Sequence, residues 1–180
     1  TASIPNVAKW TAEQPNLYTI LYRIKREGRF TEYVACRVGF RTVETEGERF
    51  LINGEPVVFK GVNLAEHMPQ TGNVVDTAQM RRMLTEMKFS GVNAVRTDGY
   101  PMPYSFYQLC DELGFYVCDV ADIDAWGLGT NLNKGGTISN DPAWREAYLA
   151  RIDAMYERNK NHPSVVMWSL GDRSGNGYNM

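Results

Sequence analysis

Residues 93–118, NAVRTDGYPMPYSFYQLCDELGFYVC, hold the pattern that decides the fold. The run Phe115–Cys118 is continuously apolar, which is typical of a strand buried on both faces, and Asn93–Arg96, with Ala94-Val95 at its centre, is predicted to be a second short strand. Between them, residues 104–113 are predicted to form a helix, and Gly114 is placed to end it. A strand, a helix and a second strand in this order indicate parallel strands joined by a crossover helix.

The same alternation continues on both sides of this unit. Strands are predicted at 57–62 and 165–168, and helices at 76–89 and from Pro142 to about 160. The order is therefore β-α-β-α-β-α-β, which predicts a parallel α/β sheet covered by helices. Each strand is followed by a polar segment that contains glycine or ends in charged residues, and the carboxyl ends of such strands carry the functional site in parallel α/β folds.

A (β/α)₈ barrel fits this pattern better than a dinucleotide-binding fold, because no G-x-G-x-x-G follows a strand. Such a barrel typically needs about 250 residues, whereas residues 45–180 have room for about four βα units. We therefore predict the first half of a TIM (β/α)₈ barrel over residues 45–180. Asn53-Gly54, between two apolar runs, predicts a tight hairpin at its start.

The first 44 residues are expected to be β-structure of a different kind. Leu17–Ile24 and Tyr33–Val38 are rich in β-branched and aromatic residues, and Glu27-Gly28 supplies a turn between them. Two strands alone are marginally stable at best. We therefore predict that residues 1–44 are the last strands of a β-sandwich domain.

Composition excludes several classes of function. The chain has 43% hydrophobic and 22% charged residues, as expected for a folded globular protein, and its net charge of −2 argues against a nucleic-acid partner recognised by bulk charge. No apolar run is long enough to predict a membrane span. No signal peptide is visible either, which favours the cytoplasm but leaves the location open. The three cysteines have no metal-binding or redox spacing.

Several sequence blocks appear in an order that resembles one known family. They are Trp10–Tyr18, Val38–Arg41, Leu51–Pro56, Lys60–Asn63, Asn93–Arg96 with Tyr100-Pro101, and Asn161–Val165 with Trp168–Gly171. In this order they resemble glycoside hydrolase family 2, and most closely its β-galactosidases. The resemblance implies strands of an immunoglobulin-like sandwich followed by the first half of the catalytic TIM barrel. It also implies a β-galactoside-type carbohydrate as substrate.

The resemblance fails where the family carries its chemistry. The family's fourth strand ends in Gly-Asn-Glu-Ser-Gly, with the Glu as general acid/base, but residues 171–175 read GDRSG. Arg173 therefore stands at the acid/base position, and a guanidinium stays protonated at any practical pH. The family's nucleophile is a Glu on a later strand, beyond Met180. We expect a chain that is not catalytically competent as it stands, with Asp172 as an alternative proton donor or a structural residue.

The family's metal ligands are also replaced. β-Galactosidases carry Asn-Ile-Glu-Thr-His-Gly after strand three, where the Glu and His help to bind Mg²⁺, but residues 122–127 read DIDAWG. Asp124 could still bind a metal, whereas Trp126 cannot. We expect no metal and no cofactor, and an ion pair between Arg173 and Asp124 in their place.

The candidate carbohydrate-binding residues follow the four predicted strands. Asp119, Asp122, Asp124 and Asp172 are expected to gather at two adjacent strand ends. Glu66 and His67 match retained family positions but could equally form a loop pair, and His162 is expected to pack or cap. The full candidate set is Asn63, Glu66, His67, Arg96, Asp98, Tyr100, Asp119, Asp122, Asp124 and Trp126.

Three functions stay open at this point: an enzyme-family chain that is inactive alone, a non-catalytic carbohydrate-binding protein that uses Tyr100 and Trp126, and an engineered or structural half-barrel assembly unit. All three predict a homo-oligomer or a complementing chain, because a half barrel exposes two sheet edges and an apolar inner face. The inward residues are expected to include Phe59, Val95, Val117 and Met167 or their strand neighbours.

Overall fold

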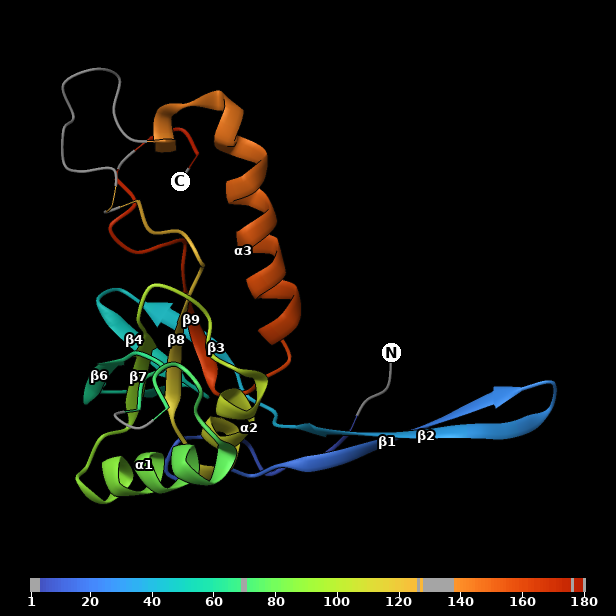
Figure 1. Ribbon diagram of the computed structural model, residues 1–180. Helices are drawn as coiled ribbons and strands as arrows, with labels where there is room; N and C mark the ends of the chain where they lie inside the picture. The colour runs from blue at the N-terminus through green and yellow to red at the C-terminus, as the bar shows by residue number, and fades with distance from the viewer. Residues whose placement is uncertain (1–3, 69–70, 126, 128–137, 176, 180) are drawn as a thin grey trace.

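A four-stranded parallel sheet forms the centre of the computed structural model, which describes residues 4–68, 71–125, 127, 138–175 and 177–179. Its strands lie side by side in chain order, and each pair is parallel (Figure 1). This arrangement confirms the predicted alternation of strands and helices and the barrel-type sheet. The strands are β6 (Gly61–Leu64), β7 (Ala94–Thr97), β8 (Tyr116–Val120) and β9 (Val165–Ser169).

Helices α1 (Thr77–Phe89) and α2 (Tyr104–Leu113) cover one face of the sheet. Asp76 caps the start of α1, since its Oδ1 accepts hydrogen bonds from two backbone amides of the first turn. Gly114, at φ 77°, ends α2 as expected. The third predicted helix differs at its start. Pro142 opens a 3₁₀ turn (Pro142–Trp144), and α3 follows over Arg145–Asn159.

The direction of the strand side chains decides between the two alternatives that the sequence left open. Val95 and Val117 are 1% and 0% exposed and pack against α1 and α2, so that their strand neighbours face inward. Side chains alternate between faces along a strand, so a run that is apolar throughout does not reveal which residues point inward. The inner face instead carries a row of register partners across four strands: Asn63, Arg96, Cys118 and Met167.

The first barrel strand is also shorter than predicted, because residues 57–60 lie outside it. Their backbone is held by the side chain of Asn93: the amide of Lys60 donates to Asn93 Oδ1 (2.7 Å), and Asn93 Nδ2 donates to the carbonyl of Val58 (3.0 Å). A side-chain amide thus supplies the partners that a ladder would otherwise provide. Pairing with β7 begins only at Gly61.

The predicted Asn53-Gly54 hairpin is present, with φ values of 57° and 86° that suit a two-residue turn. It joins β4 (Arg49–Ile52) to β5 (Glu55–Pro56), and β3 (Val43–Glu46), which the sequence did not indicate, pairs on the other side of β4.

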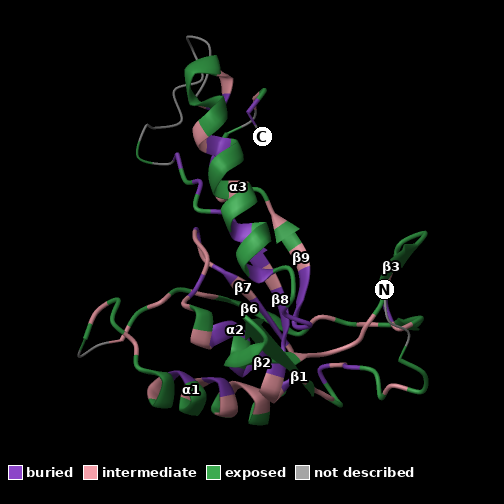
Figure 2. Cartoon of the chain, turned by 90° about the vertical axis from the view of Figure 1, so that its right-hand side faces the viewer, coloured by how far each residue is buried: buried purple, intermediate pink, exposed green. Residues whose placement is uncertain are grey.

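A long hairpin, β1 (Tyr18–Arg26) and β2 (Arg29–Val38), projects away from the sheet (Figure 1). The segment before it is anchored on the sheet, because Trp10 is fully buried and its Nε1 donates to the carbonyl of Asp111 (2.9 Å). Figure 2 shows buried residues gathered on the strands and on the sides of α1 and α2 that face them, whereas α3 is mostly exposed. The domain division at residue 44 stays a prediction.

Candidate functional site

The carboxyl ends of β8 and β9 bring two aspartates together. The segments that follow these strands pair at an isolated parallel bridge between Asp124 and Asp172, and the amide of Asp172 donates to the carbonyl of Ile123 (2.9 Å). The hydroxyl of Ser174 donates to the same carbonyl (2.7 Å). The backbone therefore fixes two carboxylates beside each other at the edge where parallel α/β proteins place their sites.

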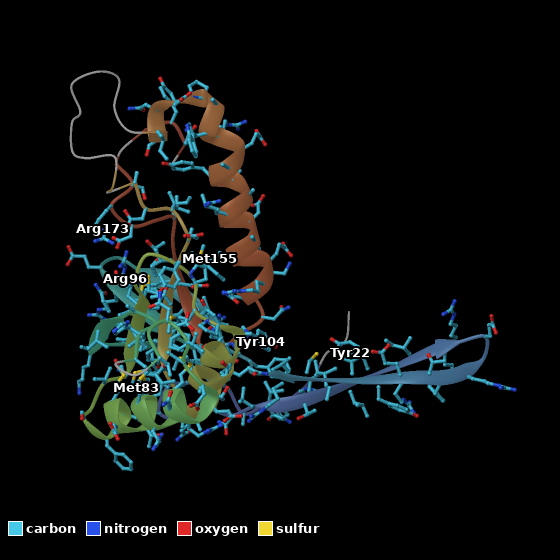
Figure 3. All side chains as sticks on the ribbon, viewed as in Figure 1. Tyr22, Met83, Arg96, Tyr104, Met155 and Arg173 are labelled. Carbon is cyan, nitrogen blue, oxygen red and sulfur yellow. The ribbon has the colours of Figure 1, made fainter. Side chains whose placement is uncertain are left out.

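Two arginines alternate with these aspartates in a chain of opposite charges. Arg173 Nη2 lies 2.7 Å from Asp124 Oδ2, and Arg173 Nε lies 3.6 Å from Asp172 Oδ2. Arg96 Nη2 approaches the other oxygen of Asp172, at 3.4 Å. Figure 3 shows Arg96 and Arg173 above the same end of the sheet. The predicted ion pair between Arg173 and Asp124 is thus confirmed.

The turn that carries Arg173 is tightly constrained. Arg173 adopts φ 44°, in the left-handed region that L-residues with a side chain rarely occupy. Two residues earlier, a Cβ added to Gly171 would lie 2.5 Å from Ser174 Oγ and 2.8 Å from the carbonyl oxygen of Ile123. Only glycine fits at 171, so the packing of this turn determines the direction in which Arg173 leaves the backbone.

The other two aspartates of the expected cluster lie elsewhere, which corrects the prediction of four gathered carboxylates. Asp119 points to the helical face and is fully buried, where it accepts hydrogen bonds from Tyr107 Oη (2.6 Å) and Asn159 Nδ2 (2.7 Å). Burial raises its pKa above the ordinary value of 3.8, against the opposing effect of these hydrogen bonds. Asp122 is exposed, and its Oδ2 lies 4.0 Å from Arg151 Nε.

The loops after β6 and β7 supply the remaining candidates. Asp98 and Tyr100 are half-buried, and the loop that carries them passes close to the aspartate pair, since a Cβ on Gly99 would lie 4.0 Å from Asp124 Oδ2. Glu66 is half-buried and His67 is exposed. Trp126 lies outside the described residues.

A hollow of about 260 Å³ opens on the inner face of the sheet below these loops. Asn63, Arg96, Cys118 and Met167 line it together with Phe59, so polar and apolar groups share its wall. Burial raises the pKa of the Cys118 thiol above its ordinary value. A hollow of this size that offers an amide and a guanidinium beside apolar side chains has room for a small molecule.

A buried polar cluster behind the sheet was only partly foreseen. His162 packs as predicted: it is buried, and its Nδ1 lies 2.6 Å from Asp111 Oδ2. Asp111 Oδ1 also accepts a hydrogen bond from the amide of Ser164 (3.0 Å). The guanidinium of Arg41 donates to the carbonyls of Pro163 and Val165. An acidic residue inside the apolar stretch of the 104–113 helix was the signal for this cluster.

The Mg²⁺ implied by the family resemblance does not fit the donor set present. Three residues stand at the positions of the family's Mg²⁺ ligands. Asp124 keeps a carboxylate, Trp126 has no suitable donor, and Arg173 carries a positive charge directed at Asp124. Among the residues that the structure describes, no three His, Cys, Asp or Glu side chains lie close enough together to hold a metal ion. None of the described helices is both long and apolar enough to cross a membrane.

The fold and the charged strand ends together define part of a TIM-barrel protein of the glycoside hydrolase type. Residues 43–180 match the family model described as glycosyl hydrolases family 2, TIM barrel domain, and residues 1–41 match the model of glycosyl hydrolases family 2. The chain therefore belongs to glycosyl hydrolase family 2.

Individual relatives agree with this assignment. The chain is 42% identical to a β-galactosidase of Photobacterium profundum over 98% of its length, and 44% identical to one of Vibrio vulnificus over 95%. These matches cover 17% and 16% of the relatives. The chain thus spans about a sixth of the length of the curated relatives it matches.

Among solved structures, the β-glucuronidase of Ruminococcus gnavus superposes with a TM-score of 0.82 at 30% identity, covering 92% of this chain and 28% of that one. A β-glycosidase from Bacteroides vulgatus gives 0.76 at 29% identity, covering 91% and 21%. The resemblance read from the sequence blocks and the predicted fold class are both confirmed.

Proposed function

We propose that this chain forms part of a β-galactoside-binding cleft and does not hydrolyse glycosides as it stands. The observation that carries the proposal is the place of Arg173, which occupies the acid/base position of the family motif and pairs with Asp124 at 2.7 Å. A retaining glycosidase needs two carboxyl groups, one of which donates a proton to the leaving oxygen. A guanidinium does not give up its proton at neutral pH.

Asp172 is a poor substitute for the missing acid. Both of its carboxylate oxygens face guanidinium groups, Arg96 at 3.4 Å and Arg173 at 3.6 Å. This arrangement suits a hydrogen-bond acceptor rather than a proton donor. Asp172 therefore serves the site by orienting the two arginines.

The binding half of the proposal rests on the polar groups around the hollow. Asn63 and Arg96 lie on its wall, and Asp98 and Tyr100 are carried by the loop beside Asp124. An amide can donate to and accept from sugar hydroxyls, a carboxylate accepts from them and a guanidinium donates to them. An aromatic ring can stack on the apolar face of a pyranose. Glu66 and His67 follow β6, at the same edge of the sheet.

Two measurements on the purified protein test the proposal. Isothermal titration calorimetry with isopropyl β-thiogalactoside is expected to show binding that Arg96→Ala weakens at least tenfold, whereas Arg82→Ala on the far side of α1 leaves it unchanged. Release of nitrophenol from an aryl β-galactoside and an aryl β-glucuronide is expected to equal that of a heat-killed control. Turnover that disappears in Asp172→Asn, or the absence of any sugar binding, would contradict the proposal.

A second candidate function, a half-barrel assembly unit, is favoured by one observation. The inner row of the sheet is partly open, with Asn63 exposed and Met167 half-buried at the hollow. A second chain that covers this face would complete both the barrel and the cleft. Sugar binding that appears only in the associated form would join the two candidates into one function.

A further inference from the structure

We infer that Arg173 is the built-in cation of this site: its guanidinium holds the Asp124–Asp172 carboxylate pair in the place that a divalent cation would take, so that guanidinium and divalent cation exclude each other. The inference concerns the same strand ends as the proposed function. It is tested without any sugar, so metal binding and sugar binding can fail independently.

The first step is electrostatic. The bridge between the segments after β8 and β9 places Asp124 and Asp172 side by side. Neighbouring carboxylates repel each other unless positive charge lies between them. Arg173 contacts both, at 2.7 and 3.6 Å, and Arg96 contacts Asp172 from the other side. Two guanidinium groups therefore balance the two carboxylates without an external ion.

The second step is geometric. Mg²⁺ demands oxygen ligands at about 2.0–2.1 Å in a near-octahedral shell. In this structure an N–H group of Arg173 is directed at Asp124 Oδ2, so one of the two oxygens that Asp124 could offer a metal already accepts a hydrogen bond from a cation. A cation added next to that guanidinium would meet like-charge repulsion across a few ångströms in a partly desolvated site.

The backbone of the turn keeps Arg173 in place. Its left-handed φ of 44°, the close fit around Gly171 and the hydrogen bonds of Ser174 Oγ to the carbonyls of Ile123 and Asp172 together fix the turn. The guanidinium is thus presented by a rigid turn, as a bound ion would be, and replacing one residue is enough to remove it.

Substitution of Arg173 tests the inference through binding of Mn²⁺, measured by calorimetry and electron paramagnetic resonance with MnCl₂ as the probe. Wild-type protein is expected to show no Mn²⁺ binding beyond the weak, nonspecific binding of exposed carboxylates elsewhere on its surface. Arg173→Glu is expected to bind Mn²⁺ at least tenfold more tightly than Arg82→Glu, which changes the net charge equally on α1. Arg173→Gln, which removes the charge without adding a ligand, is expected to fall between them.

Two further outcomes keep the test decisive. Adding Asp124→Asn to Arg173→Glu is expected to abolish the gained binding. If Arg173→Glu does not fold in EDTA, a cooperative thermal transition restored by Mn²⁺ would support the inference. Wild-type binding of Mn²⁺ that depends on Asp124, or a folded Arg173→Glu that binds no better than Arg82→Glu, would overturn it.

Discussion

Arg173 Nη2 lies 2.7 Å from Asp124 Oδ2, although 49 residues separate the two in the chain. The contact joins the loop after β8 to the loop after β9, and it does so at the edge of the sheet where the family carries its chemistry. A positive side chain has thus taken a position where the resemblance places a carboxylic acid, while the surrounding backbone is kept. The consequence is a site whose charges are balanced internally.

The left-handed backbone at Arg173 predicts an unusual order of stability among its variants. The half-exposed ion pair of Arg173 stabilises the fold by about 0.2–1 kcal/mol, and Arg173→Ala loses this contribution. Arg173→Gly removes the same pair but relieves the φ of 44°, so we expect it to be more stable than Arg173→Ala by about 0.5–1 kcal/mol. Urea unfolding measures the difference.

The matched control is the same pair of changes at Arg82 in the middle of α1, where the order should reverse. There glycine is expected to be less stable than alanine by about 1 kcal/mol. Equal stability of Ala and Gly at position 173 would show that the turn relaxes when the ion pair is lost.

The fold was predictable because its signals are local. Continuous apolar runs separated by helical segments indicate a parallel sheet, and glycines such as Gly114 mark where helices end. The Arg173–Asp124 pair was predictable for a different reason: each residue follows a neighbouring strand, and the ends of neighbouring parallel strands meet.

The direction of individual side chains was not predictable. Along residues 115–118 the hydrophobic pattern has no period of two, so nothing in that run separates Val117, which faces the helices, from Cys118, which faces inward. The same ambiguity hid the true place of Asp119. Its partners, Tyr107 and Asn159, come from two different helices, and no spacing along the chain indicates that they meet.

Asp119 should make stability depend on pH in a defined direction. Because burial raises its folded-state pKa above the unfolded value, the folded protein binds this proton more readily than the unfolded chain does. The contribution of Asp119 to the free energy of unfolding is therefore fully present below the unfolded-state pKa, and it is lost as the pH rises through the folded-state pKa. The free energy of unfolding of wild type minus that of Asp119→Asn should therefore fall as the pH rises from below 3.8 through the folded-state pKa.

Chemical denaturation of both proteins across this range measures the difference. For every whole unit between the folded and unfolded pKa values, the fall amounts to about 1.4 kcal/mol. A difference that rises with pH would mean that the hydrogen bonds from Tyr107 and Asn159 stabilise the carboxylate more than burial destabilises it.

Asp111 is predicted to be the most sensitive carboxylate behind the sheet. It is 4% exposed, and it accepts hydrogen bonds at both oxygens from groups near the start of β9, His162 Nδ1 and the amide of Ser164. Asp111→Ala leaves both groups without this partner in a buried setting, so we expect a loss of about 2–5 kcal/mol in the free energy of unfolding. Asp111→Asn, which keeps one acceptor oxygen, should lose less.

Asp153 on the exposed side of α3 provides the comparison, since Asp153→Ala is expected to change stability by less than about 0.5 kcal/mol. Thermal or urea unfolding of the three variants gives the ranking. A mild effect of Asp111→Ala would indicate that water replaces the carboxylate, and that the cluster does not hold the start of β9.

The projecting hairpin predicts self-association of the purified chain. Large apolar side chains of β1 and β2 are exposed along its length, with Leu21 at 57% and Tyr33 at 58%, and Tyr22 lies on it far from the sheet (Figure 3). Apolar surface of this extent on an isolated hairpin, together with the open inner face of the sheet, marks an interface. We therefore expect a dimer or larger species at low micromolar concentration, or capture of a complementing chain.

Light scattering coupled to size exclusion measures this self-association. Leu21→Lys and Tyr33→Lys together should shift the protein toward monomer, because the two side chains lie on one face of the hairpin, whereas Glu32→Lys on the opposite face should shift it less. A stable wild-type monomer with a cooperative melt would contradict the prediction and would show that the hairpin and the sheet tolerate exposure without a partner.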